Sequence, residues 1–253
     1  MPSFMDSRSG RSRPEFSGRL LRLANCLVFS IALVATAQVR EVAADEAPLP
    51  PGLEVYKGRR IADFMHWRGA EWLIRDRRER EERCSLMLAN LGVKPGMTVC
   101  DMGCGNGFHT LKLAKLVGPE GRVLGVDIQP QMLKMLKERA QAADIANIEP
   151  IQGTVADPKL PDGQVDIILC LDVYHEFSHP ERMLAAMRRS LSPDGVVVLV
   201  EFREEDPKVP IKPLHKMSKQ QILKELPPNG FKLVKEFDRL PWQHMMFFAR
   251  DGT

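Results

Sequence analysis

Hydrophobic and polar positions follow two kinds of pattern along this chain, and the change between them comes near residue 97. After that point, short apolar runs typical of strands alternate with segments in which apolar residues recur every three or four positions, as in helices. The expected strands are residues 98–102, 122–128, 148–153, 165–171, 195–202, 232–237 and 244–250, and the expected helices are 110–117, 131–143, 182–191 and 219–226.

This alternation of strands and helices predicts an α/β fold with a doubly wound, mostly parallel sheet of seven strands. Residues 165–171 and 195–202 are almost continuously apolar, as expected of strands that are covered on both faces. The final two strands are close in sequence and form an expected hairpin, which makes the last strand antiparallel. We assign residues 93–253 to this domain.

A helical segment over residues 57–92 is expected to precede the sheet domain as a cap. Apolar residues alternate there with arginine and glutamate, and Gly92 is placed to end the last helix. The dense run of charges at residues 75–82 is most simply the solvated face of a helix. A proline-containing linker, residues 45–56, comes before this segment.

The first 44 residues are predicted to be a targeting segment. Arginines precede an apolar run over residues 23–37, and Ala35-Thr36-Ala37 supplies a small-residue cleavage site, as in a secretory signal peptide. The run is shorter than the roughly 20 apolar residues of a membrane span. We therefore expect export to the periplasm or the medium, with an uncleaved membrane anchor and an organellar presequence as alternatives.

The net charge of +3 is unevenly distributed. Residues 1–40 hold six arginines and two acidic residues, which leaves a charge of −1 for the rest of the chain. A nearly neutral body lacks the basic surface that nucleic-acid binding requires. Four of the five cysteines follow the N-terminal segment, and we expect them to be buried thiols because a domain of this size needs no disulfide.

The strongest chemical signal is the turn after the first strand, Val99-Cys100-Asp101-Met102-Gly103-Cys104-Gly105-Asn106-Gly107. Its three alternate glycines permit unusual backbone angles and let a ligand approach the main chain. Asp101 stands at the carboxyl end of the strand, the edge at which open α/β sheets bind ligands. Asp127 closes the second strand, where an acid can accept hydrogen bonds from both hydroxyls of a ribose or cap the following helix.

Three ligands compete for this arrangement. A dinucleotide needs Gly-x-Gly-x-x-Gly, but the third glycine position counted from Gly103 holds Phe108, and the acid in the turn would repel a pyrophosphate. A Walker-type phosphate loop needs Gly-Lys-Ser/Thr, which the sequence lacks. The pattern favours a cationic nucleoside without phosphate groups.

Together with the strand 166–171 and the turn Leu191-Ser192-Pro193-Asp194-Gly195, these motifs resemble those of class I methyltransferases in order and spacing. The chain as a whole is similar to uncharacterised exported bacterial members of that family. The resemblance implies a Rossmann-like fold, S-adenosylmethionine as the cofactor and methyl transfer as the activity. The cofactor-binding residues that it implies are Asp101, Gly103, Cys104, Gly105 and Gly107 at the methionine and sulfonium end, Asp127 at the ribose and Ile128 at the adenine.

One departure from the family concerns adenine recognition. The family often has an acid directly after the glycine that closes the third strand, whereas Gly153 is followed here by Thr154, and the acid comes at Asp157. Either Asp157 reaches the adenine, or Thr154 and the main chain bind it. The structural alternative for Asp157 is that it begins the turn before Pro158.

Residues 171–177 follow the fourth strand, where enzymes of this family place groups beside the transferring methyl. An oxygen or nitrogen acceptor can require a base with a pKa near 7, so His175 is the candidate base. Tyr174 is expected to border the cofactor or the acceptor, and Asp172 to contact the cofactor or to orient His175. The alternative for His175 is a loop histidine that packs structurally.

The same segment matches H-E-x-x-H through His175-Glu176-Phe177-Ser178-His179, a signature of zinc hydrolases. That chemistry requires both histidines on one face of a helix. Pro180 disfavours helical geometry at the residue before it. A zinc hydrolase stays a remote alternative, and we assign no metal ligand from the sequence.

The expected cofactor site at the carboxyl edge of the sheet has to be closed by other parts of the chain, and two segments are candidates. One is the N-terminal segment with its aromatic residues Tyr56, His66, Trp67 and Trp72, and the other is the charged, lid-like stretch 203–217. Without a separate recognition domain, the expected partner is a small-molecule acceptor methylated on oxygen or nitrogen. We expect no nucleic acid, and a membrane only if the targeting segment is uncleaved; the sequence indicates no oligomeric state. The alternative function is a catalytically inactive nucleoside-binding module.

Overall fold

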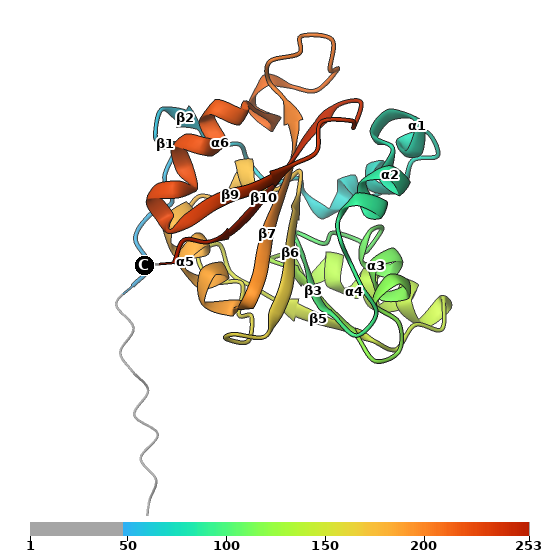
Figure 1. Ribbon diagram of the computed structural model, residues 1–253. Coiled ribbons are helices and arrows are strands. Elements are labelled where there is room, and N and C mark those ends of the chain that lie inside the picture. The colour runs from blue at the N-terminus through green and yellow to red at the C-terminus, as the bar shows by residue number, and fades with distance from the viewer. Residues whose placement is uncertain (1–47, 253) are drawn as a thin grey trace, which may run out of the picture. The chain divides into compact units, whose positions relative to one another are not determined.

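The computed structural model describes residues 48–252, so the predicted targeting segment and Cys26 lie outside the described residues. Residues Leu49–Thr253 form one compact unit. Its centre is a twisted sheet with helices on both faces (Figure 1). Within residues 48–252, none of the helices combines the length and the hydropathy of a membrane span.

The sheet confirms the predicted doubly wound topology. Its strand order is β5-β4-β3-β6-β7-β10-β9, and only β10 runs antiparallel to its neighbours, while the short β8 pairs with β7 beyond this path. The strands are β3 (Thr98–Met102), β4 (Arg122–Asp127), β5 (Ile148–Gln152), β6 (Val165–Leu171), β7 (Leu191–Arg203), β8 (Lys216–Met217), β9 (Phe231–Glu236) and β10 (Gln243–Arg250).

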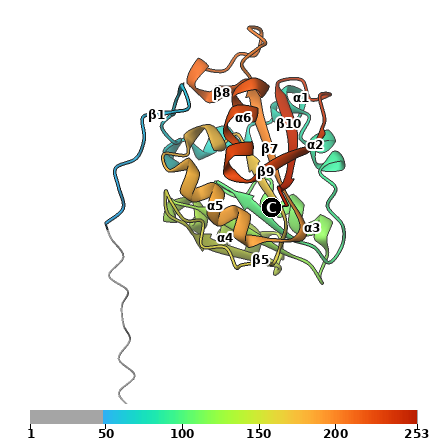
Figure 2. The same cartoon turned by 60° about the vertical axis from the view of Figure 1, so that its left-hand side comes forward.

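Helices cover the two faces of the sheet, as two views show (Figures 1 and 2). On one face lie α2 (Cys84–Asn90) and α3 (Thr110–Val117), and on the other lie α5 (Pro180–Ser190) and α6 (Lys219–Glu225). The helix α4 (Pro130–Ala142) packs against β4 and β5.

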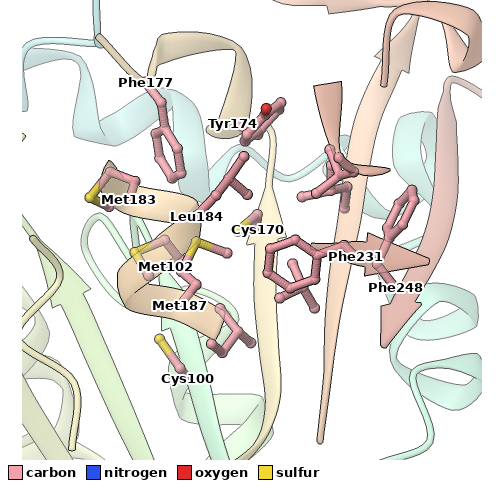
Figure 3. Packing of buried hydrophobic residues seen from close by; sticks show 14 of the residues in the cluster. Cys100, Met102, Cys170, Tyr174, Phe177, Met183, Leu184, Met187, Phe231 and Phe248 are labelled. Atoms are coloured by element: carbon pink, nitrogen blue, oxygen red, sulfur yellow. The ribbon is translucent and has the colours of Figure 1, made fainter. Parts of the chain in front are cut away.

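Alternate residues of each strand enter the two cores. In β3, Val99 joins the core under α2 and α3, whereas Cys100 and Met102 join the core under α5 and α6. Figure 3 shows the second core, in which cysteine and methionine side chains lie among aromatic and aliphatic ones. This period of two is the pattern that made the strands recognisable in the sequence. Four cysteines of the described range are buried and free, as predicted.

The N-terminal segment is not helical throughout, contrary to the prediction for residues 57–92. It begins with a hairpin of β1 (Val55–Tyr56) and β2 (Arg59–Arg60). It continues as the 3₁₀ helix η1 (Trp67–Ile74) and the short helices α1 (Arg78–Glu82) and α2. Strands of two residues are too short to produce an alternating pattern, so the hydropathy of the sequence did not reveal them.

The charged run at residues 75–82 is not simply a solvated helix face, which corrects the prediction. Arg78 and Glu82 are only 4% and 2% exposed, and Nε of the arginine lies 2.8 Å from Oε2 of the glutamate. Arg75 contacts the same carboxylate, and the Arg78 guanidinium lies 4.8 Å from the ring centre of Phe108. This buried ion pair therefore anchors the N-terminal segment beside the turn that follows β3.

Most predicted boundaries agree with the structure within one or two residues, the usual fraying of helix and strand ends. The clearest difference is Leu191–Gly195, which was predicted as a turn before the fifth strand. The structure begins β7 at Leu191, which pairs with Val165, and the register shifts before Ile167. Three further 3₁₀ turns complete the chain: η2 (Tyr174–Glu176), η3 (Pro213–His215) and η4 (Pro227–Asn229).

Candidate functional site

The candidate site lies where the order of the strands reverses. From β3 the chain continues to β4 on one side, and β6 flanks β3 on the other. In open α/β sheets, ligands bind outside the carboxyl ends of the strands at such a point. The loops after β3 and β6 touch there, since a Cβ atom added to Gly103 would lie 2.5 Å from Cγ2 of Val173.

The predicted glycine turn has the backbone that its sequence requires. Gly103, Gly105 and Gly107 have φ angles of 68°, 54° and 83°, a region that other residues rarely adopt. A Cβ atom on Gly107 would overlap Cδ1 of Leu136. The buried Cys104 lies between the glycines, and its amide donates to the carbonyl of Val126 at 2.9 Å.

Asp127 stands at the end of β4 and connects the glycine turn to α4. Its Oδ2 accepts a hydrogen bond from the amide of Gly105 at 3.0 Å, and its Oδ1 accepts one from the amide of Gln129 at 2.8 Å. Burial raises the pKa of this carboxyl, although these amides oppose the rise. A carboxylate has about four acceptor sites, so capacity is left for the hydroxyls of a ribose. Ile128, the predicted adenine neighbour, is half-buried beside it.

Asp101 is buried at the end of β3, with 3% of its surface exposed. Its Oδ2 accepts a hydrogen bond from the hydroxyl of Thr110 at 2.5 Å. Burial raises its pKa to about 6, because the interior disfavours the charged form. The carboxyl group therefore gains from a cation at this edge of the sheet.

Two polar side chains of the loop after β5 lie at the surface. Oγ1 of Thr154 accepts a hydrogen bond from the amide of Asp157, whose own Oδ1 accepts one from the amide of Lys159. Both Thr154 and Asp157 are exposed. This geometry matches the predicted turn before Pro158, and contact of either residue with adenine stays a prediction.

The N-terminal segment lies across the glycine turn. Nδ2 of Asn106 donates to the carbonyl of Ala70 at 3.0 Å, and Gln129 bonds to the amide of Trp67 and the carbonyl of Met65. The expected cover is therefore built from residues around η1. Tyr56 is not part of it, because its hydroxyl contacts Glu181 and Asn229 near α5 and η4.

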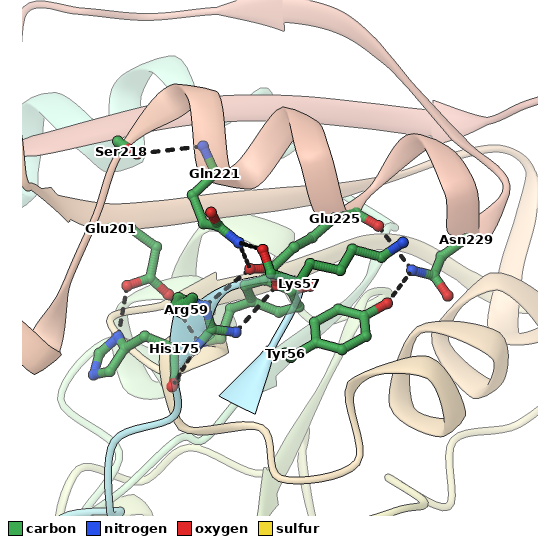
Figure 4. Close-up of polar contacts among 10 residues, drawn as sticks. Tyr56, Lys57, Arg59, His175, Glu201, Ser218, Gln221, Glu225 and Asn229 are labelled. Atoms are coloured by element: carbon green, nitrogen blue, oxygen red, sulfur yellow. Dashed lines mark hydrogen bonds and ion pairs between the residues drawn. The ribbon is translucent and has the colours of Figure 1, made fainter. Parts of the chain in front are cut away.

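His175 lies in η2, directly after β6, and is only 2% exposed. Its Nδ1 lies 2.7 Å from Oε2 of Glu201, and its Nε2 lies 3.1 Å from Nδ1 of His215 (Figure 4 shows the pair with Glu201). Burial by itself lowers the pKa of His175, but the Glu201 carboxylate outweighs burial and the pKa is raised. The next residue, Glu176, has a pKa raised to about 7 by burial.

Asp172 does not orient His175, contrary to one of its two predicted roles, since Glu201 holds the imidazole. The backbone of Asp172 is left-handed, with φ of 52°. Its Oδ2 accepts a hydrogen bond from Nε2 of Gln243 at 2.9 Å, while its Oδ1 is buried and has no partner within the described residues. Burial, with the nearby acids Glu82 and Glu201, raises its pKa well above the ordinary value.

Tyr174 does not border the site, contrary to the prediction. Its ring is fully buried in the core under α5 and α6, next to Phe177 (Figure 3). Its hydroxyl donates to Oε2 of Glu225 at 2.8 Å, and only its amide faces the site, donating to Oε1 of Glu201. The side chain therefore anchors η2 to α6.

The H-E-x-x-H histidines point to different partners. Nε2 of His179 lies 2.8 Å from the carbonyl oxygen of Pro50, and its Nδ1 lies 3.0 Å from Oγ of Ser178. Both ring nitrogens are thus engaged away from His175. The geometry does not support the zinc-hydrolase arrangement of this motif.

Glu201 is the site residue that sequence reasoning missed. It is fully buried although it is ionisable, and it lies in β7 beside the carboxyl end of β6. A single acid within the apolar run Val196-Val197-Val198-Leu199-Val200-Glu201-Phe202 is the signal that could have found it, because buried carboxylates are rare without a functional or structural partner. His215 was expected only as part of the lid-like stretch, and the structure places it against His175.

A family profile described as "Methyltransferase domain" matches residues 93–243. Among curated proteins, the ubiquinone/menaquinone biosynthesis C-methyltransferase UbiE of Salmonella arizonae is 32% identical over 148 residues, which cover 58% of this chain and 57% of that protein. An uncharacterised protein from a Streptomyces fradiae transposon is 34% identical over 117 residues, which cover 46% of this chain and 33% of that protein. The chain thus spans between a third and three fifths of the length of these relatives.

Solved structures share the fold. A SAM-dependent methyltransferase from Aquifex aeolicus superposes with a TM-score of 0.69 at 24% identity, over 73% of this chain and 98% of that one. The [4+2]-cyclase SpnF superposes with a TM-score of 0.54 at 21% identity, over 62% of this chain and 58% of that one. At these identities the likeness establishes the fold, and the reaction has to be argued from the site.

Proposed function

The chain belongs to the methyltransferase family whose profile spans residues 93–243, and from this premise we propose that it transfers a methyl group from S-adenosylmethionine to an oxygen or nitrogen atom of a small-molecule acceptor. The observation that carries the proposal is the placement of His175. Its imidazole is held on Glu201 directly after β6, at the same edge of the sheet as Asp101, Asp127 and the glycine turn.

The residues at this edge suit S-adenosylmethionine, which has an ammonium and a sulfonium group but no phosphate. The buried carboxylate of Asp101 would accept a hydrogen bond from the ammonium group, and Asp127 would accept hydrogen bonds from the ribose hydroxyls. At Gly103, Gly105 and Gly107 the space of a Cβ atom is taken by the side chains of Val173, Leu73 and Leu136, so only glycine lets these segments pack against the turn. When bound, the cofactor supplies an electrophilic methyl group on sulfur.

Two groups of this chain would handle the acceptor. Nδ1 of His175 faces a carboxylate that can only accept, so it carries the hydrogen, and Nε2 of the neutral ring has a lone pair. Nε2 lies 3.1 Å from Nδ1 of His215, so that side chain would move aside when Nε2 takes a proton from the acceptor. Oδ1 of Asp172, which is buried and has no hydrogen-bond partner among residues 48–252, would hydrogen-bond the acceptor and align it. Alignment for an in-line displacement supplies several kcal/mol of rate acceleration.

The first test is calorimetric titration of S-adenosylmethionine and of its demethylated product into the full-length protein. Asp127→Asn should weaken binding of both ligands, because the ribose loses its acceptor. The matched control is Asp162→Asn, which removes a carboxylate with 75% exposure far from the site and should bind like the wild type. A folded protein that binds neither ligand would refute the proposal.

The second test separates an enzyme from an inactive nucleoside-binding module. A panel of small phenols, alcohols and amines is incubated with the protein and methyl-labelled cofactor. His175→Gln and Glu201→Gln should each lower turnover by about 100-fold or more while cofactor affinity is retained, because they remove proton transfer and not the cofactor contacts. No turnover with any acceptor, together with intact binding, favours the inactive module.

A carbon acceptor is the second candidate, and the similarity to UbiE proteins, whose name specifies C-methyl transfer, favours it. The two candidates differ in the product. Carbon-13 labelling of the transferred methyl group places its NMR signal near those of ethers and amines for oxygen and nitrogen acceptors, and near those of alkyl carbons for a carbon acceptor.

A further inference from the structure

Two histidines and a glutamate meet above the carboxyl ends of β6 and β7. Nε2 of His175 lies 3.1 Å from Nδ1 of His215 and 3.9 Å from Oε1 of Glu176, and the three ligand atoms all lie within 4.8 Å of one another. Metal–ligand bonds of about 2.0–2.2 Å place neighbouring ligand atoms about 3.0–3.5 Å apart. Small side-chain movements would therefore bring all three atoms onto one ion.

Glu201 orients His175 as a metal ligand. Its Oε2 lies 2.7 Å from Nδ1 of His175, and its Oε1 is held by the amide of Tyr174 at 2.8 Å. The carboxylate fixes the ring and keeps the hydrogen on Nδ1, so the lone pair of Nε2 points at His215 and Glu176. Histidine ligands of metal ions characteristically donate their second ring nitrogen to a carboxylate in this way.

The charges of the cluster also favour a cation. Glu176 and Glu201 contribute two carboxylates, and His175 is their only ion-pair partner within 4.0 Å among the described residues. Arg59 donates to the carbonyl oxygen of His175, but its charge is paired with Glu225 (Figure 4). Buried charges are normally paired or bound to a metal.

We infer that His175, His215 and Glu176 bind one divalent ion of a first-row transition metal. Imidazole nitrogen with carboxylate oxygen is a ligand set for Zn²⁺, Fe²⁺ or Mn²⁺. Three protein ligands leave coordination positions open, as catalytic metal sites do. His215 belongs to the stretch 203–217 and is only partly buried, so an ion could reach the cluster from its side.

The role of the ion rests on the proposed function and deepens it. Binding of the ion does not depend on that function. The ion would coordinate the oxygen of an acceptor hydroxyl, which then releases its proton to water more readily. The oxygen forms a bond to the methyl carbon while the carbon–sulfur bond breaks and its electron pair stays on sulfur. In this state His175 is a ligand, and the ion replaces it as the group that activates the acceptor.

The experiment uses full-length protein that has been dialysed against a chelator and desalted, with neither cofactor nor acceptor present. Zn²⁺ is titrated by calorimetry, and Co²⁺ by its visible absorption, which reports nitrogen ligation and geometry. We expect one ion per chain. His215→Ala and Glu176→Gln should each weaken binding by about tenfold or more. Both side chains are partly exposed, which favours folding of the variants.

His66→Ala is the matched control, because His66 is an exposed histidine outside the cluster. This variant should bind the metal ion as tightly as the wild type does. Folded protein that binds no ion, or variants that bind as the wild type does, would overturn the inference. Metal binding in a protein that does not bind S-adenosylmethionine would support the metal site and refute the proposed function. Methyl transfer at full rate in chelator overturns the role of the ion and leaves the proposed function standing.

Discussion

Replacing Asp101 with asparagine tests whether the site is built to receive a cation. The carboxyl group is 3% exposed, and burial raises its pKa from 3.8 to about 6, against the opposing effects of the Thr110 hydroxyl and Arg78. Asparagine keeps the shape of the side chain, and its oxygen can still accept the hydrogen bond from Thr110. The substitution therefore removes ionisation with little change in packing.

The magnitude follows from the pKa. A folded-state value above the unfolded one means that the folded protein binds this proton more tightly than the unfolded chain does. The free energy of unfolding therefore falls as pH rises from about 4 to about 6 and is constant above that range. At 1.36 kcal/mol for each pKa unit, the loss is about 3 kcal/mol. The asparagine in Asp101→Asn cannot ionise. As pH rises from 4 to 7, the free energy of unfolding of the variant should therefore rise by about 3 kcal/mol relative to that of the wild type.

Urea unfolding, followed by circular dichroism at a series of pH values, measures this difference. The exposed Asp162→Asn variant is the control, and its stability should run parallel to that of the wild type. If the free energies of unfolding of the wild type and of Asp101→Asn also change with pH in parallel, burial of this carboxylate does not cause the pH dependence, and the reasoning fails.

The same carboxylate links stability to cofactor binding. An ammonium group beside Asp101 favours its ionised form, so the affinity of the wild type for S-adenosylmethionine should fall below pH 6, by up to about tenfold per pH unit. Asp101→Asn should bind more weakly, without that pH dependence. Calorimetry at two pH values decides the matter, and equally tight binding by the variant would show that the predicted ammonium contact is wrong.

Three further predictions concern packing around the site. Glu82→Gln leaves Arg78 buried without its partner and should lower the free energy of unfolding by about 3–5 kcal/mol, whereas Glu81→Gln, a change at a more exposed carboxylate, should cost less than about 1 kcal/mol; urea unfolding compares them. Tyr174→Phe removes a buried hydroxyl and should cost about 1–2 kcal/mol of stability with methyl transfer unchanged, so a selective loss of turnover would mean that Tyr174 reaches the site after all. Gly103→Ala adds a Cβ atom at a φ of 68°, where it meets a valine side chain; it should cost about 1–3 kcal/mol and weaken cofactor binding, and an unchanged melting temperature would contradict this.

Local patterns were sufficient to predict the sheet and to place the glycine turn and two acids at one edge of it. Apolar alternation in β3 and the glycines after it depend on neighbouring residues alone, because side-chain direction in a strand and the allowed φ of a residue are set locally. Asp101 and Asp127 could be placed at the carboxyl edge for the same reason, since parallel strands end on one side. The hairpin of β1 and β2 was missed because its strands have only two residues each.

The partners of the site residues depended on tertiary structure. Glu201 meets His175 only because β7 lies beside β6, and His215 meets it only because the stretch after β7 returns to the same edge, 40 residues along the chain. The sequence alone established a parallel sheet, a glycine turn and two acids suited to a cationic nucleoside. Only the packing of distant segments decided that Tyr174 is buried in the core and that a buried carboxylate holds His175 at the carboxyl edge of the sheet, because contacts between residues far apart in sequence leave no periodic pattern in it.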